Sequence, residues 1–76
     1  ALNAHCNALA EQYGLSPRET ELLPLLAIGL SSGVIGRRAF ISPQTVKSHR
    51  SHIFQKVNVH SHEELVEKLG LYDLNV

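Results

Sequence analysis

The stretch SPQTVKSHRSHIFQKV, residues 42–57, decides how this chain is organised. Its first two residues, a serine followed by a proline, are a typical helix start, because serine caps the first turn and proline fits the first helical position. At about 100° per residue, Val46, Ile53 and Val57 then fall on one side and form an apolar seam. The stretch is therefore predicted to form one amphipathic helix.

The side of this helix away from the seam, with its two shoulders, is polar and free of acidic residues. It carries Gln44, Thr45, Lys47, Ser48, His49, Arg50, Ser51, His52 and Lys56. A solvated helix usually mixes glutamate with lysine, because opposite charges four residues apart stabilise it. The absence of that mixture favours a surface that binds a polyanion. Arg50 lies nearest the seam, so we expect it to make a phosphate or intramolecular contact rather than to contact bases.

The net charge of zero conceals a segregation of charge along the chain. No acidic residue occurs between Leu22 and His62. The same window contains the basic residues Arg37, Arg38, Lys47, Arg50 and Lys56. A positive middle between two acidic-leaning ends is the local charge distribution that binding to nucleic acid needs.

Length and composition predict one small globular domain, with 76 residues of which 43% are apolar and 18% charged. No apolar run approaches the roughly 20 residues of a membrane span, and no secretory leader pattern is present. Cys6 is the only cysteine, which rules out a disulfide within the chain and fits the cytoplasm. Because the sequence contains no methionine, we expect a piece of a longer protein, one that receives a signal or is tethered to a membrane.

Helix-start and helix-stop signals predict about four further short helices. The first carries the apolar stripe Leu2, Cys6, Leu9 and Tyr13 and should end at Gly14. We expect that stripe to pack on its own domain, with a partner chain as the alternative. The second helix begins at the capping box of residues 16–19 and should bury Leu22, Leu23, Leu25, Leu26 and Ile28, ending near Gly29. Pro24 inside it predicts a kink rather than a break.

The remaining two helices are shorter. Ser31 or Ser32 should cap the third, which carries Ile35 and Gly36. A second capping box, residues 61–64, opens the last helix, whose apolar residues are Leu65, Val66 and Leu69. The predicted class is all-α, a small helical bundle with one extra N-terminal helix.

The third helix, the connection of residues 40–42 and the basic helix follow one another in the order of a helix-turn-helix. In that motif the second helix enters the major groove of DNA. Lys47 can donate to guanine O6 or N7, and Gly36 would let the two helices approach closely. The alternative that these residues leave open is a helical core whose surface happens to be basic.

Residues 15–66 resemble the LuxR-type DNA-binding domain of the LuxR, FixJ, NarL and GerE-like regulators. The residues that carry the resemblance are Leu15-Ser16-Pro17-Arg18-Glu19, Ile35-Gly36-Arg37-Arg38, Phe40-Ile41-Ser42 and Thr45-Val46-Lys47-Ser48-His49-Arg50. Four linked motifs in the family's order and spacing are a specific signal. The resemblance implies a four-helix bundle built around a helix-turn-helix, in a response-regulator-like bacterial transcription regulator that binds inverted-repeat double-stranded DNA as a homodimer.

The resemblance also implies roles for single residues. Lys47 and Ser48 fall where family members contact bases, and Thr45, His49 and Lys56 fall where they meet phosphate or pack beside it. The last helix, with Leu65, Val66 and Leu69, falls where the family dimerises. The departures are Ser51 in place of a larger contact residue, the unusual Pro24, Gly36 in place of alanine, and Ser32-Gly33-Val34 in place of the usual Asn-Lys-Glu.

The resemblance divides the chain in two. Residues 1–14 are a helix or linker to an upstream sensory or receiver domain, and residues 15–76 are the DNA-binding domain. The alternative is a protein-interaction module that keeps the fold without binding DNA.

An enzyme and a metal site are not expected. No paired carboxylates or nucleophile-and-base pattern is present, and the spacing of Cys6, His52, His60 and His62 matches no structural zinc motif. We therefore expect no catalytic residue, no metal and no cofactor.

Overall fold

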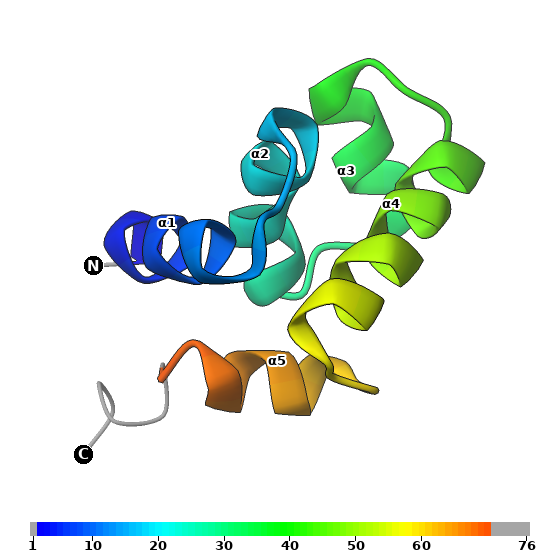
Figure 1. The fold of residues 1–76 in the computed structure, drawn as a ribbon. Coiled ribbons are helices and arrows are strands. Elements are labelled where there is room, and N and C mark those ends of the chain that lie inside the picture. The colour runs from blue at the N-terminus through cyan, green and yellow to red at the C-terminus, as the bar shows by residue number, and fades with distance from the viewer. Residues whose placement is uncertain (1, 71–76) are drawn as a thin grey trace.

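The computed structural model describes residues 2–70, and every regular element within them is an α-helix (Figure 1). The helices are α1 (Leu2–Tyr13), α2 (Pro17–Ala27), α3 (Ser32–Ala39), α4 (Pro43–Val57) and α5 (His62–Lys68). The predicted all-α class, with an extra N-terminal helix, is confirmed. The last six positions of the predicted domain 15–76 and the first position of the segment 1–14 lie outside the described residues.

Serine caps begin four of the five helices, where the sequence predicts them. Ser16 and Glu19 form a complete capping box, and Ser42 accepts a hydrogen bond from the Thr45 N–H at 3.1 Å. Of the two candidates for the start of α3, Ser31 is the cap, because its hydroxyl accepts from the Val34 N–H at 3.3 Å. These caps satisfy N–H groups that a helix leaves without partners, so each fixes where its helix begins.

The ends of the first two helices follow the predictions in part. Gly14 adopts a left-handed φ of +66° directly after α1, as predicted. α2 continues through Pro24, so the proline does not break it. Ile28, predicted to be buried, is 57% exposed. It lies at the C-cap of α2, where the chain leaves the helix for the left-handed Gly29, and its side chain therefore no longer follows the inward stripe.

The core lies where the five helices meet. Its fully buried members include Leu22, Leu23, Ile35, Val46, Ile53, Val57 and Leu65. Leu25, predicted to be buried, packs against this cluster but is only partly buried. One charged residue is buried as well, Glu19 at 4% exposure, and the apolar pattern gave no sign of it.

The N-terminal helix packs on its own domain, as expected. Cys6, Leu9 and Ala10 are buried against the common core, and α1 contacts both α2 and α4. The Lys68 ammonium of α5 lies 5.1 Å from the centre of the Tyr13 ring, so the last helix also contacts the first. The predicted stripe on α1 is therefore a core face of this chain.

The turn between α3 and α4 is tight. Phe40 adopts a left-handed φ of 59° and Ile41 donates its N–H to the Gly36 carbonyl at 3.0 Å. A Cβ atom on Gly36 would lie 2.6 Å from the Ile41 carbonyl oxygen, so only glycine fits without movement of the turn. The predicted close approach at Gly36 is confirmed, and the backbone of the turn is what approaches it.

Candidate nucleic-acid interface

The second helix of the motif, α4, lies along one edge of the molecule beside α3 (Figure 1). Val46, Ile53 and Val57 are its buried residues, each exposed by no more than 1%. The predicted seam thus fixes how α4 is rotated about its own axis. The opposite side of the helix must face away from the core.

The predicted site residues are therefore brought to one exposed surface. His49 is partly buried, and the other eight are exposed: Gln44, Thr45, Lys47, Ser48, Arg50, Ser51, His52 and Lys56. The residues directly opposite the seam and on its Lys47 border are Gln44, Lys47, Ser48 and Ser51, which we call the reading face. Thr45 is partly engaged within the chain, because its hydroxyl lies 2.9 Å from that of Ser42.

The reading face carries an unpaired positive charge. In the described part of the chain, carboxylates pair with Arg18, Lys56 and His60. Neither Lys47 nor Arg50 has such a partner among residues 2–70. Because an unpaired ammonium or guanidinium at the surface attracts anions, this side of α4 can receive negatively charged oxygen atoms.

Lys56 has a different position from the other predicted contacts. Its ammonium lies 2.8 Å from Glu19 Oε1, and the Ser16 N–H donates to the same carboxylate oxygen at 2.8 Å. Burial alone would raise the pKa of Glu19, but the hydrogen bonds from Lys56 and Ser16 outweigh it and hold that pKa below its ordinary value. Lys56 therefore joins the end of α4 to the start of α2.

This ion pair was not predicted from the sequence. Glu19 was recognised only as the second half of a capping box, and Lys56 lies 37 positions away. No helical period connects residues at that separation. The fold alone brings the two side chains together.

The Arg50 guanidinium lies over an aromatic ring of its own helix. Its guanidinium carbon is 4.8 Å from the centre of the Phe54 ring, one turn further along α4. This is an intramolecular contact, one of the two kinds of contact expected for Arg50. The contact attracts the guanidinium to the ring face, and Arg50 as a whole is exposed.

Residues 13–69 match the family model described as bacterial regulatory proteins of the luxR family. The chain belongs to the luxR family. The match covers the whole helix-turn-helix and all nine predicted contact residues. It confirms the resemblance drawn from the four motifs, and it extends it to the end of α1.

The relatives of this luxR-family chain include regulatory proteins of staphylococci. It is 49% identical over 53 residues to the oxygen regulatory protein NreC of Staphylococcus carnosus, across 70% of this chain and 24% of that protein. The NreC proteins of Staphylococcus epidermidis and Staphylococcus aureus are 47% and 45% identical over the same shares. The chain spans about a quarter of the length of these curated relatives. No solved structure matches the chain significantly.

The last helix of this luxR-family domain corrects part of the predicted dimer contact. Leu65 is fully buried and Leu69 is 4% exposed, so both belong to the core of the same chain. They pack inward because α5 contacts α2, where the His62 ring lies 2.8 Å from the Ala27 carbonyl oxygen. Val66 is partly exposed, and it is the one residue of the predicted trio that a second molecule could reach.

Other kinds of site find no support among the described residues. Within residues 2–70, no group of three or more His, Cys, Asp or Glu is placed to hold a metal ion. Cys6 is buried, and burial raises the pKa of its thiol, which makes it a poor nucleophile. No helix among residues 2–70 is long and apolar enough to cross a membrane.

Proposed function

We propose that this luxR-family domain binds double-stranded DNA in a sequence-specific manner, as the output domain of a bacterial transcription regulator. The observation that carries the proposal is the reading face, an acid-free surface with an unpaired Lys47 on the second helix of a helix-turn-helix. In such motifs that helix lies in the major groove, with its N-terminal half at the base edges.

Each part of the surface has a separate role in the proposed complex. Lys47 donates to a guanine, and the Ser48 hydroxyl contacts a neighbouring base. Gln44 and Ser51 extend the same face of α4 by one helical turn in each direction. Thr45 and His49, on the side of α4 next to His52, contact phosphate oxygens. Phosphate contacts supply most of the affinity, and base contacts select the sequence.

The proposed regulator extends beyond this chain. Its relatives are named oxygen regulatory proteins, and the matched region is about a quarter of each. We propose that the rest of the protein carries an upstream sensory or receiver domain, that it acts in the cytoplasm, and that its signal is passed to the domain described here.

The first experiment selects a duplex from a random pool and measures its affinity for the parent chain as salt is raised. Affinity should fall steeply with salt, since binding releases counterions from the DNA. Lys47→Ala should weaken the selected duplex by about 1–3 kcal/mol and relax the preference at one base pair. Lys68→Ala, the loss of an exposed lysine on α5, is the matched control and should change neither. An Lys47→Ala variant with unchanged affinity and preference would remove the base-contact role.

Two copies of the domain should occupy one operator. A single short recognition helix binds a half-site weakly, and two copies on an inverted repeat combine their contacts. The partly exposed Val66 is the proposed point of contact, a patch too small for a stable dimer in solution. Val66→Glu should abolish the second binding event and leave half-site affinity nearly intact, as measured by sedimentation with full-site and half-site duplexes. Equal cooperativity in parent and variant would exclude α5 as the dimer contact.

One observation favours the alternative, a protein-interaction module. Phe40 in the turn of the motif is 93% exposed, and a large aromatic side chain at the surface is common in protein interfaces. The salt titration separates the two functions, because docking through an aromatic residue would respond little to salt while DNA binding responds strongly.

A further inference from the structure

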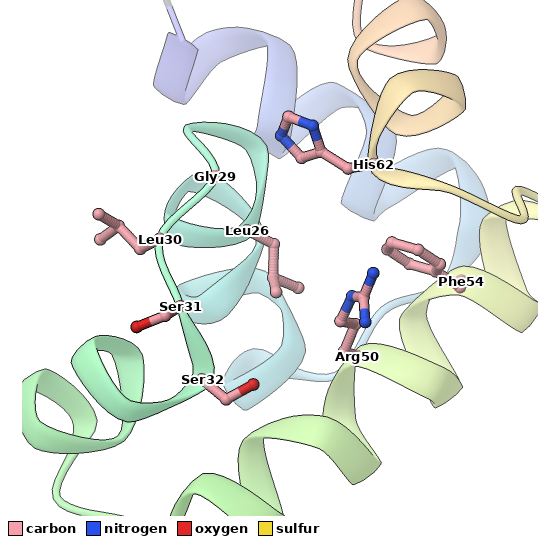
Figure 2. Close-up of a pocket in the computed structure, with 8 residues that line it drawn as sticks. All are labelled: Leu26, Gly29, Leu30, Ser31, Ser32, Arg50, Phe54 and His62. Atoms are coloured by element: carbon pink, nitrogen blue, oxygen red, sulfur yellow. The ribbon is translucent and has the colours of Figure 1, made fainter.

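Two neighbouring hollows lie along α4 on the side of Arg50 and Phe54. The first, of about 220 Å³, lies between the end of α2, the start of α3, the middle of α4 and the start of α5 (Figure 2). The second, of about 450 Å³, continues from the same two side chains towards Asn58 and His60. Arg50 and Phe54 line both hollows, and we call the two hollows together the Arg50 trough.

The lining of the trough favours an anion. None of the residues that line either hollow is acidic, and several present hydroxyl, amide or imidazole groups. At the His60 end, Glu64 accepts the His60 backbone N–H at 3.2 Å, and its carboxylate lies 3.7 Å from the His60 ring. The positive potential of the trough is therefore concentrated at Arg50 rather than at its His60 end.

Arg50 is oriented for a ligand that the chain itself does not supply. Its guanidinium carbon lies 4.8 Å from the centre of the Phe54 ring, and the group has no hydrogen-bond acceptor or carboxylate partner among residues 2–70. Figure 2 shows the Ser32 hydroxyl turned towards the same hollow and the Ser31 hydroxyl turned away, where it caps α3. A guanidinium offers a planar fork of N–H donors, which matches two oxygens of one phosphate.

The trough also lies beside the reading face. Arg50 is one turn after Lys47 on α4 and next to Ser51, and Ser51 and Gln55 line the second hollow. When a helix lies in the major groove, the sugar-phosphate strand that borders the groove runs along its side. The second hollow, which Ser51 of the reading face lines, is next to that face.

We propose that the Arg50 trough seats a phosphate group of the DNA backbone, with Arg50 donating to its non-bridging oxygens and Ser32 completing the contact. This assignment rests on the proposed function and adds a strand-anchoring site to it. Its contact is independent of sequence, since every nucleotide carries the same phosphate.

The test compares Arg50→Gln with Lys68→Gln, which removes another exposed cation that faces an aromatic ring, Tyr13. Arg50→Gln should weaken the selected duplex and a scrambled duplex equally, by about tenfold, and lower the salt slope by about one unit. Lys68→Gln should do neither. Arg50→Lys keeps the charge but not the fork, so it should fall between parent and Arg50→Gln. Circular dichroism establishes that each variant is folded.

A scan of the operator locates the phosphate. Duplexes with a neutral methylphosphonate at one position each are bound to the parent and to Arg50→Gln. At the seated phosphate the parent should lose about tenfold while Arg50→Gln loses nothing further. At all other contacted phosphates both proteins should lose affinity alike.

Each other outcome overturns a specific statement. A parent chain that binds no duplex overturns the proposed function and the trough with it. A parent that binds normally while Arg50→Gln changes nothing, or changes base preference, overturns the trough alone. A titration with sodium phosphate, followed by the Arg50 side-chain N–H signals, separates the sources. Saturation by free phosphate without any Arg50-dependent position in the scan would assign the trough to a small anion and overturn the DNA contact.

Discussion

Replacing Gly36 by alanine tests how tightly the turn of the helix-turn-helix is held. Helix propensity predicts a gain of up to about 1 kcal/mol, because glycine is the more flexible residue in the unfolded chain. The structure predicts a loss instead. The new Cβ would lie 2.6 Å from the Ile41 carbonyl oxygen, and the Pro43 nitrogen and the Ser42 carbonyl carbon follow at 3.4 and 3.5 Å.

The size of the loss follows from what must move. All three atoms belong to the backbone, and the Ile41 N–H is itself hydrogen-bonded to the Gly36 carbonyl at 3.0 Å, so the turn has little freedom. Overpacking of this kind costs about 1–3 kcal/mol. Set against the propensity gain, the net destabilisation should be up to about 2 kcal/mol, which lowers the melting temperature of a domain this small by up to roughly 8–16 °C.

The same helix provides the control. A Cβ on Gly33 would meet nothing closer than the Ser31 hydroxyl at 4.0 Å, so Gly33→Ala should raise the melting temperature. Thermal unfolding by circular dichroism of the parent and both variants measures the pair. If Gly36→Ala stabilises the domain as much as Gly33→Ala does, the turn is not in contact with Gly36 and the reasoning fails.

Three further predictions concern the ion pair and the turn. Because the pKa of Glu19 is lowered, the stability that this carboxylate contributes is present above the ordinary carboxyl pKa and is lost as the pH falls through its folded pKa. In Glu19→Gln the free energy of unfolding, measured by urea titrations at several pH values, should therefore fall less at acid pH than in the parent. Lys56→Met should lower the free energy of unfolding by about 1–2 kcal/mol, less than for a fully buried pair, because the Lys56 side chain is 42% exposed. If the variant also lowers the salt dependence of DNA affinity by a full unit, Lys56 contacts a phosphate. Phe40→Gly should raise the melting temperature, since a 93% exposed side chain in a left-handed conformation gives up little contact; a fall would mean that the ring packs on the domain.

Local signals in the sequence predicted most of the fold. The serine caps, the glycine stop after α1 and the seam on α4 each depend on residues within one or two turns of one another. They were therefore visible without the structure, and they place every helix. The seam alone determined which side of α4 faces outward, so the reading face was predictable residue by residue.

The rest depends on contacts between distant segments. Helical spacing puts Leu65 and Leu69 on one face and Val66 about 100° from Leu65. That the core takes up the first two follows only from the docking of α5 on α2. Ile28 continued the apolar pattern of α2, yet the chain turns at that residue. The Arg50 trough could not be predicted either, because it is formed where four helices meet.

The buried Cys6 can report local opening of α1 through its reaction with thiol reagents. The thiol is 1% exposed beneath α1, and it is the only cysteine in the sequence. An alkylating reagent can reach it only when α1 separates from α2 and α4, so the rate of labelling measures how often that local opening occurs. The labelling rate of Cys6 can be measured with and without DNA, and no cysteine has to be introduced. A change in the labelling rate would show whether DNA bound at α4 makes α1 open more often or less often. α1 is the helix that would connect this domain to an upstream domain.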